Sequence, residues 1–298
     1  KTIGILTSGG DAPGMNSAIR AAVRTALNSG LRIKGIRNGY DGLMQGDIYE
    51  MNVSSVADII HKGGTILGTA RSLEFETPEG QKRGAQILND YGIEGLIVIG
   101  GDGSFKGAKA LSDLGINTIG IPGTIDNDMG YTDFTIGFFT AIETVSDAIG
   151  KLRDTSSSHG RAVVIEVMGR NCGDLGLYSG LAGGAESIIV PEHEFSMDDI
   201  VEKMEHGRKR GKLHHLITLA EGVGDPYSIA KELEEKTGIE TKVTILGHVQ
   251  RGGSPSVVDR LLGSTMGARA VELLSEEKTN LAIGYVDGSL IEVSIEDA

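Results

Sequence analysis

Cysteine is almost absent from this sequence of 298 residues, in which Cys172 is the only one. A single cysteine cannot form a disulfide within the chain, and the paired Cys or Cys/His spacings that are typical of zinc sites do not occur. No apolar run approaches the roughly 18 residues that a membrane span requires, and the first residues show no signal-peptide pattern. We therefore expect a soluble protein of the reducing cytoplasm.

Positive charge is also in short supply, because 28 Lys and Arg stand against 41 Asp and Glu and give a net charge of -13. A nucleic-acid binder depends on a basic face that neutralises phosphates, so this balance argues against nucleic acid as a partner. A hydrophobic content of 39% excludes a disordered chain. The length predicts about two domains, which can bury a core without disulfides.

Glycine, by contrast, is abundant, and many of the 45 glycines follow short apolar runs. Continuous apolar runs are typical of strands that are buried on both faces. Helical periodicity separates these runs; over 16–28, for example, apolar residues recur at the spacing of one helix face. We expect strands at 2–6, 95–100, 118–123, 161–169, 187–191, 215–222 and 242–247. This alternation predicts an α/β fold with two mainly parallel sheets, the long helical pattern at 138–154 leading from one to the other.

Two glycine-rich turns follow expected strands and precede expected helices: TSGGDAPGMN at 7–16 and GGDGSFKG at 100–107. Glycine lets backbone amides approach an anion at a helix N-terminus, so both turns are candidate phosphate sites. Asp102 would repel a phosphate unless a divalent cation lay between them, which indicates a magnesium nucleotide. A tight turn without a ligand explains the first turn equally well, and neither turn matches the P-loop or the Rossmann fingerprint.

A third segment, PGTIDND at 122–128, places Asp126 and Asp128 on one side of the chain if the strand continues that far. One carboxylate could then accept a proton from an attacking hydroxyl while the other helps to hold a metal. Ordinary turn chemistry is the alternative, because Asp and Asn are common in turns.

Several cations flank the expected strands: Arg71, Arg161, Arg170, His248 and Arg251. In so acidic a chain the arginines are candidate phosphate clamps, because guanidinium matches phosphate in a bidentate geometry. Surface salt bridging is the alternative. A second basic set is more typical of solvated helix ends: Arg20, Arg24, Arg153 and the run at 207–215.

Seven motifs, in this order and across nearly the whole chain, resemble those of bacterial ATP-dependent 6-phosphofructokinases. They are ILTSGGDAPGMN, VIGGDGS, PGTIDND, DTSSSHGR, EVMGRNCGD, AEG and LGHVQRGG. The resemblance implies an α/β fold of two Rossmann-like domains, each a mainly parallel sheet in three layers, with the active site in the cleft between them. It implies a larger ATP-binding domain at 1–137 plus 251–298 and a smaller domain for fructose 6-phosphate at 138–250.

Members of this family phosphorylate the 1-hydroxyl of fructose 6-phosphate with MgATP, the committed step of glycolysis. By resemblance, Asp126 is the general base, Thr124 and Arg170 contact the transferring phosphoryl group, and Asp128 supports the metal side. The ATP site would comprise Gly10, Arg71, Ser72, Gly101, Asp102, Gly103 and Ser104, with Asp102 at Mg²⁺. Fructose 6-phosphate would be held by Thr124, Ile125, Asp126, Met168, Gly169, Arg170, Glu221, His248, Val249, Gln250 and Arg251.

The resemblance also implies a homotetramer with shared active sites, in which Arg161 and Lys242 reach the sugar phosphate of a neighbouring subunit. ADP as activator and phosphoenolpyruvate as inhibitor would bind an effector site. That site would comprise Arg20, Ala21, Ala22, Val23, Arg24, Arg153, Gly184, Ala185, Glu186, Arg210, Lys212, Leu213 and His214. The basic set that charge alone assigns to solvated helix ends thereby gains a function.

Two positions depart from the family pattern in ways that predict altered behaviour. Lys242 stands where arginine is common, which keeps the charge but gives up bidentate geometry, so we expect weaker affinity for the sugar phosphate. Val53 stands where well-regulated relatives carry an effector-site arginine, so we expect blunted inhibition by phosphoenolpyruvate.

A further departure concerns the ATP side. Glu76 and Gln81 occupy a loop that supplies arginines towards ATP in relatives, and Lys82 and Arg83 are the nearby candidates to compensate. The chain also ends at Ala298, before the last helix usual in the family, which suggests a trimmed chain.

Two rival functions fit the same motifs less well. A pyrophosphate-dependent relative would tend to carry Asp after GGD and Lys before TIDND, whereas this chain has Gly103 and Gly123, which leave room for a nucleotide. A non-catalytic nucleotide sensor would usually lose the base, whereas Asp126 is present. The sequence therefore favours ATP as the phosphoryl donor of an active enzyme.

Overall fold

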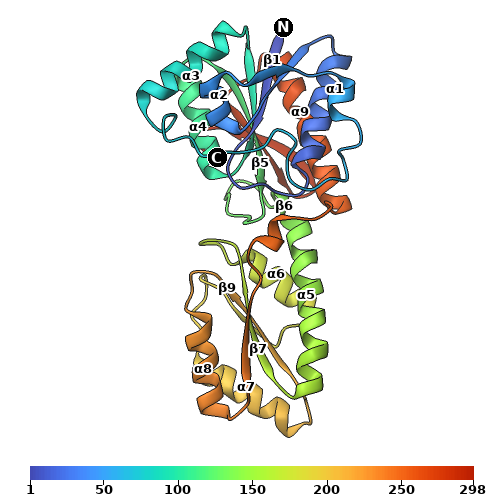
Figure 1. Ribbon diagram of the computed structural model, residues 1–298, viewed down its shortest axis with the longest axis vertical. Helices are drawn as coiled ribbons and strands as arrows, with labels where there is room; N and C mark the ends of the chain where they lie inside the picture. Colours follow the sequence, from blue (N-terminus) through green and yellow to red (C-terminus); the bar gives the residue numbers. More distant parts are fainter. The chain divides into compact units, whose positions relative to one another are not determined.

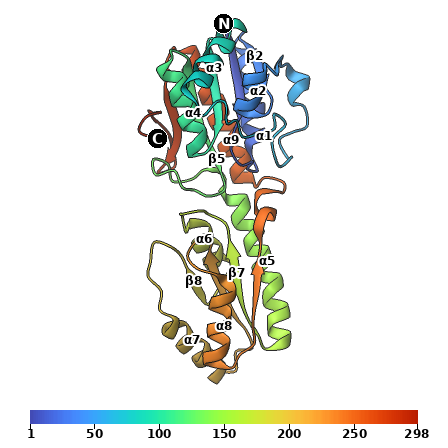
Figure 2. The same ribbon diagram turned by 60° about the vertical axis from the view of Figure 1, so that its left-hand side comes forward.

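The structure is a computed structural model that describes residues 1–298. Contacts within the chain divide it into two compact units (Figure 1, Figure 2). The larger unit comprises Lys1–Thr124, Met129–Thr140 and Arg251–Ala298, and the smaller unit comprises Ile125–Asp128 and Ala141–Gln250. The short segment Ile125–Asp128 therefore groups with the smaller unit rather than with the strand that precedes it.

The larger unit contains an eight-stranded sheet in the order β12-β11-β5-β4-β1-β2-β3, with β6 paired to β5. Its strands are β1 (Thr2–Thr7), β2 (Arg32–Ile36), β3 (Ile48–Glu50), β4 (Gly95–Gly100), β5 (Asn117–Thr124), β6 (Ile136–Gly137), β11 (Leu281–Val286) and β12 (Ser289–Ser294). Only β3 and β12, the two edge strands, pair antiparallel to their neighbours. Every residue of β4 is buried, which is why this strand lacks polar alternation.

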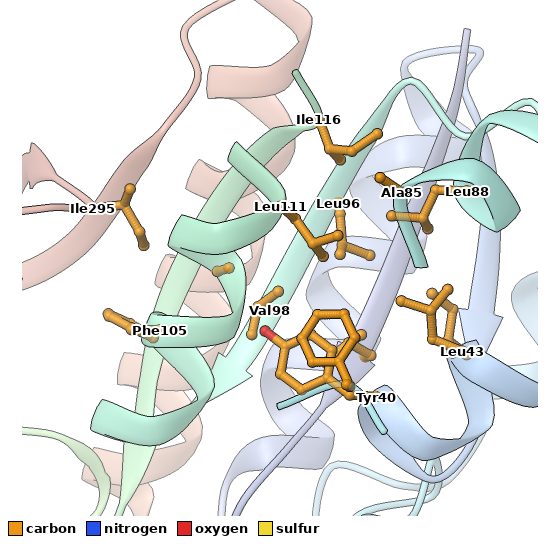
Figure 3. Packing of buried hydrophobic residues seen from close by; sticks show 14 of the residues in the cluster. Tyr40, Leu43, Ala85, Leu88, Leu96, Val98, Phe105, Leu111, Ile116 and Ile295 are labelled. Carbon is orange, nitrogen blue, oxygen red and sulfur yellow. The ribbon is translucent and has the colours of Figure 1, made fainter. Parts of the chain in front are cut away.

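Helices cover both faces of this sheet and make a three-layer unit (Figure 1). α1 (Met15–Asn28) and α9 (Val257–Ser275) pack together on one face; α2 (Gly39–Gln45), α3 (Pro78–Asp90) and α4 (Asp102–Asp113) lie on the other, and a short 3-10 helix, η1, spans Val53–Val56. Figure 3 shows the second face, where Leu96 and Val98 of β4 belong to one buried cluster with Leu88 and Leu111. Burial of each such side chain contributes about 1.5–3 kcal/mol, so this cluster anchors the strands rigidly.

The smaller unit has a fully parallel four-stranded sheet in the order β10-β7-β9-β8. Its elements are α5 (Phe138–His159), β7 (Ala162–Val167), α6 (Asp174–Gly183), β8 (Ser187–Ile189), α7 (Met197–Lys209), β9 (His215–Ala220), α8 (Pro226–Thr237), β10 (Thr241–Ile245) and the 3-10 helix η2 (Gly247–Arg251). α7 and α8 pack on one face, and α6 lies on the other beside α5 (Figure 2). None of the chain's helices combines the length and the apolar character that crossing a bilayer demands.

The predicted α/β fold with two mainly parallel sheets is confirmed, and each of the seven expected strands is present. The helix expected at 138–154 continues to His159. Sequence patterns did not indicate β2, β3, β6, β11 or β12. A signal for the last pair was available, because Asp287 and Gly288 have φ of 49° and 81°, the two-residue hairpin turn for which an Asp-Gly pair is typical.

Candidate active site

The two glycine-rich turns lie next to each other in the larger unit. β1 and β4 are neighbours, but the chain leads from β1 to β2 and from β4 to β5, so the strand order diverges between them. Ligands of open parallel sheets bind at such a divergence, beyond the carboxyl ends of the strands. There Ser8 N donates to Ile99 O at 3.0 Å, and a Cβ at Gly100 would lie 2.5 Å from Ser8 O, so only glycine fits. The fold thus brings together the two turns that the sequence singled out.

Arg251 lies against the first of these turns. A Cβ at Gly10 would fall 1.6 Å from Arg251 Nη1, so the guanidinium occupies the space that the missing side chain leaves. Arg251 Nε is buried without a hydrogen-bond partner. A buried donor costs free energy until an acceptor reaches it, and phosphate is a well-matched acceptor for guanidinium. Gly10 and Arg251 therefore form one candidate anion site.

The second turn opens α4. Gly101 is the N-cap of α4 and no side chain caps it, which leaves backbone N–H groups at the helix start for an anion. Asp102 stands in the first turn, where Asp102 Oδ2 accepts from Lys106 Nζ at 2.7 Å. A side chain at Gly103 would meet nothing within 4 Å, so the turn is open on that side. Ser104 Oγ is buried without a partner, a second polar atom that a ligand could satisfy.

The remaining expected ATP contacts are less concentrated. The Arg71 side chain is exposed, and its Nε lies 3.2 Å from Glu76 Oε1. Glu76, one of the residues that depart from the family pattern, therefore contacts this arginine. Ser72 is buried, and its hydroxyl accepts a backbone N–H three residues further on at 3.4 Å. Arg83 pairs with Glu74 and donates to a backbone carbonyl, so it is already engaged within the larger unit.

Gly123 differs from Gly103 in the room around it. A Cβ at Gly123 would lie 3.0 Å from Ile99 Cγ2 and 3.1 Å from Met15 Cε, which is tighter than ordinary packing. The open space expected at both glycines is therefore found only at Gly103. Thr124, the next residue, lies with its Cβ 3.7 Å from the Cβ position of Gly101, beside the second turn.

Asp126, in the smaller unit, is a buried carboxylate beside an arginine. Its side chain is 5% exposed, and Arg170 Nε lies 3.3 Å from Asp126 Oδ2, where it supplies the compensating charge that a buried carboxylate needs. β5 ends at Thr124, and Asn127 has a left-handed backbone with φ 52°. The expectation that Asp126 and Asp128 share one side of a continuing strand is therefore wrong, because the left-handed residue between them breaks the alternation.

Arg170 belongs to a tight turn after β7. Gly169 and Arg170 have φ of 141° and 54°, a backbone that is uncommon for a residue with a side chain. Glu221 Oε1, directly after β9, accepts from both amides, at 3.1 Å and 2.8 Å. Met168 N donates to Gln250 Oε1 at 3.2 Å. Residues expected at the sugar site after β7, β9 and β10 are thus brought together.

The expected sugar contacts differ in what they can touch. Ile125 is 2% exposed and Gln250 is fully buried, so their side chains support the loops rather than face a ligand. Gln250 Nε2 donates to Gly247 O at 3.0 Å and so ties the turn after β10 to the turn after β7. His248 and Val249 are exposed.

Arg161 and Lys242 lie at the other end of this sheet, beside the amino ends of β7 and β10. The length of β7 separates Arg161 from Met168 by roughly 20 Å, so one phosphate within one chain cannot contact both. Glu240 binds both cations, with Lys242 Nζ at 2.7 Å and Arg161 Nε at 2.5 Å, and hydrogen bonds from Lys242 and Arg161 hold the pKa of Glu240 below its ordinary value. Sequence reasoning missed Glu240, although a carboxylate two residues before Lys242 was a usable signal.

Glu186 is the centre of the expected effector residues in the smaller unit. It accepts from Lys212 Nζ at 2.5 Å and from a backbone N–H at 2.6 Å, and His214 Nε2 lies 3.6 Å away. Burial raises the pKa of Glu186, but these hydrogen bonds outweigh burial and leave the pKa below its ordinary value. Burial lowers the pKa of His214. Arg153 donates to two backbone carbonyls at the end of α6, so it lies on the side of this cluster that contains Gly184.

The other expected effector residues divide by exposure. On α1, in the larger unit, Ala22 and Val23 are fully buried, so their side chains pack in the core and offer a ligand nothing. The exposed or partly exposed members are Arg20, Ala21, Arg24, Gly184, Ala185, Arg210 and Leu213.

Comparison with known proteins gives consistent findings. The sequence model of the phosphofructokinase family matches residues 2–274. The ATP-dependent 6-phosphofructokinase of Finegoldia magna is 72% identical over 298 residues, which cover 100% of this chain and 93% of that protein. The ATP-dependent 6-phosphofructokinase of Clostridium tetani is 62% identical with the same coverage. The solved phosphofructokinase of Saccharomyces cerevisiae is similar in fold, with a TM-score of 0.92 and 37% identity over all of this chain and 45% of the yeast chain.

Proposed function

This chain belongs to the phosphofructokinase family, and we propose that it transfers the terminal phosphoryl group of ATP to the 1-hydroxyl of fructose 6-phosphate. The products are fructose 1,6-bisphosphate and ADP, and the reaction is the committed step of glycolysis. The observation that carries the proposal is the contact of Asp126 with Arg170. This reaction needs a proton acceptor and a cation near the same centre, and that contact supplies both.

We assign ATP to the larger unit, as the resemblance leads us to expect for 1–137 plus 251–298, although Ile125–Asp128 groups with the smaller unit. Support comes from the adjoining turns after β1 and β4, the uncapped start of α4 and the open space at Gly103. The proposed nucleotide contacts are Gly10, Arg71, Ser72, Gly101, Asp102, Gly103 and Ser104. Because the Arg251 guanidinium fills the space over Gly10, phosphate recognition at this turn involves Arg251 as well.

Asp102 is the residue that we propose for the magnesium ion. Its carboxylate is half exposed at the start of α4 and already holds one cation, the Lys106 ammonium, so the donor suits a metal. No group of three or more His, Cys, Asp or Glu side chains forms a metal cage in this chain. A single carboxylate fits Mg²⁺, which commonly completes its shell with phosphate oxygens and water. When bound, the ion would neutralise charge on the donor phosphates.

The smaller unit supplies the acceptor side of the proposed reaction. Asp126 takes the proton of the sugar hydroxyl as the bond to phosphorus forms, and a base so positioned contributes about 10²–10⁴-fold to the rate. Arg170, with a largely exposed side chain, stabilises the negative charge on the transferring phosphoryl group, to which Thr124 also donates. Met168, Gly169, Glu221 and His248 bind the sugar phosphate. Arg251, which the resemblance also assigns to the sugar phosphate, belongs to the larger unit.

Assembly and regulation follow from the same proposal. The separation of Arg161 and Lys242 from Met168 supports their acting on the sugar phosphate of a neighbouring subunit in a homotetramer. The cluster of Arg153, Glu186, Lys212 and His214 supports an effector site for ADP and phosphoenolpyruvate. Val53 of the larger unit is half exposed and uncharged at the position that the resemblance assigns to an effector-site arginine, so inhibition by phosphoenolpyruvate should be blunted. We place the enzyme in the cytoplasm.

A donor assay tests the proposed function. Purified protein is supplied with fructose 6-phosphate and magnesium, and fructose 1,6-bisphosphate is measured with either ATP or pyrophosphate as donor, with and without ADP. We expect turnover with ATP and little with pyrophosphate, because Gly103 leaves the turn open to a nucleotide. Equal or faster turnover with pyrophosphate would overturn the choice of donor, and no turnover with either would overturn the activity.

A further inference from the structure

One acidic residue of the EVMGRNCGD motif, Asp174, has no part in the function proposed above. It is the first residue of α6. Asp174 Oδ2 accepts a hydrogen bond from Asn127 Nδ2 at 2.8 Å. The partner, Asn127, directly follows the proposed base, Asp126. The contact therefore joins the start of α6 to the segment that carries the base.

Asn127 needs such a contact because its backbone is left-handed, with φ 52°. That conformation is unfavourable for a residue with a side chain, although asparagine tolerates it better than most. It persists only where the surroundings determine it. The carboxylate of Asp174 holds the side chain, and Cys172 Sγ lies 3.6 Å from Asn127 O and holds the backbone on the other side.

Asp174 also stands on the same short segment as Arg170. Cys172 N donates to Gly169 O at 2.9 Å and Gly173 N donates to Glu192 Oε1 at 2.7 Å, so the segment from Gly169 to Asp174 is folded on itself and anchored. Its two ends contact consecutive residues of the base segment. Arg170 reaches Asp126 at 3.3 Å and Asp174 reaches Asn127 at 2.8 Å.

We propose that Asp174 is a positioning residue, which holds Asn127 in its left-handed conformation and thereby aims the Asp126 carboxylate at the sugar hydroxyl. This inference rests on the proposed function, in which Asp126 is the base. The Arg170 and Cys172 contacts hold the Asp126 carboxylate and the Asn127 carbonyl, and the Asp174 contact in addition fixes the Asn127 side chain next to the base. Loss of that contact would let the base shift, and a displacement of the reacting groups by about 1 Å can cost 10²-fold in rate.

A simpler role for Asp174 would be electrostatic. An acidic residue in the first turn of a helix interacts favourably with the helix dipole and so contributes to stability. That role predicts a lower melting temperature on substitution and an unchanged rate. The positioning role predicts a lower rate with little change in melting temperature, so measuring both quantities separates the two roles.

The test uses Asp174→Ala, Asp174→Asn, Asn127→Gly and the Asp174→Ala/Asn127→Gly double variant in the full chain. Glycine accepts φ near 52° freely, so Asn127→Gly removes the side-chain contact without adding strain. We expect Asp174→Ala and Asn127→Gly each to lower kcat by roughly tenfold or more, with the KM for ATP unchanged. The double variant should be no worse than either, because both substitutions remove one contact. Asp174→Asn keeps an acceptor oxygen and should recover most of the rate.

A matched control is Asp198→Ala, which removes a first-turn acid from α7 and a surface contact with Lys236. It should leave kcat within twofold of the parent. If Asp174→Ala behaves like Asp198→Ala, or if Asp174→Asn is as slow as Asp174→Ala, the positioning role is overturned in favour of helix-end charge. Additive losses in the double variant would overturn it too.

The parent protein and Asp126→Ser are measured beside these variants so that two failures can be told apart. A parent that turns over ATP and fructose 6-phosphate, with an Asp174→Ala variant equally fast, defeats the positioning role alone. A parent without turnover, or an Asp126→Ser variant as fast as the parent, defeats the proposed function and this inference with it. Should Asp174→Ala fail to fold, Asn127→Gly leaves α6 intact and decides the question.

Discussion

The two units present their candidate sites in different ways. In the larger unit the site is made chiefly of backbone: two glycine turns side by side, an uncapped helix start and one guanidinium laid over Gly10. In the smaller unit the site is made of side chains held by other side chains, as Arg170 is held through its amide by Glu221 and Asn127 is held by Asp174. A site made of backbone should keep its binding when most nearby side chains are changed, and lose it when a substituted glycine adds a Cβ. A site made of side chains should lose its geometry when one contacting side chain is removed.

The largest effect that the comparison predicts is in the smaller unit. Asp126→Ser removes the proposed proton acceptor while Arg170 and the sugar contacts remain, so kcat should fall by about 10²–10⁴-fold with sugar binding largely kept. Steady-state kinetics with fructose 6-phosphate and MgATP, together with sugar binding by calorimetry, would measure both quantities. A loss confined to KM would mean that Asp126 binds the sugar rather than takes its proton.

The units should also respond oppositely to acid. Burial lowers the pKa of His215 in the smaller unit to about 4, whereas burial raises the pKa of Asp259 in the larger unit above its ordinary value. As pH falls from about 6.5 to 4, His215 takes up a proton in the unfolded chain but not in the native state. The free energy of unfolding of the smaller unit therefore falls by up to about 3 kcal/mol. As pH falls through the raised pKa of Asp259, the native state takes up that proton before the unfolded chain does, which favours the native larger unit.

Hydrogen exchange followed by mass spectrometry, at several pH values and corrected for intrinsic rates, reports on each unit separately. His215→Gln keeps a polar group near Ser187 but does not titrate, so it should flatten the loss of protection in the smaller unit. Equal loss of protection in both units, unchanged by His215→Gln, would contradict the prediction.

A smaller effect is expected where a Cβ enters the backbone site. Gly10→Ala places a methyl group on Arg251 Nη1, whose flexible side chain must move away, so the fold should survive. Loss of one charge-assisted contact should weaken phosphate-bearing ligands by roughly tenfold or more, seen as a raised KM. Gly130→Ala, in the same unit and with open space around it, is the control and should change nothing. An unchanged KM for Gly10→Ala would remove Arg251 from this turn's function.

The smallest effect concerns the side-chain pair at the far end of the smaller sheet. Lys242→Arg restores a fork of donors for a phosphate, so the KM for fructose 6-phosphate should fall by about two- to threefold. Steady-state kinetics at fixed MgATP would measure the change. A KM that stays the same would show that Lys242 does not set sugar-phosphate affinity.

Local patterns predicted the parts of this molecule that depend on nearby residues. The strand β4 and the turn that carries Asp102 could be predicted because an apolar run is directly followed by glycines in the sequence. The burial of β4 then follows from the fold class. The direction of Asp126 was not predictable, because it depends on a left-handed Asn127 whose partner, Asp174, lies 47 residues away. The hydrogen bonds from backbone amides to Glu221 were also not predictable, because Glu221 and Arg170 are far apart in the sequence. Glu221, expected to contact the sugar, also fixes the loop that carries Arg170.

Glu240 already contacts both Arg161 and Lys242, so one carboxylate offsets half of the charge of the two cations. A phosphate that bound them, as we propose, would have to share these cations with Glu240 or displace it. The net gain on binding is then the difference between two interactions rather than the whole of one.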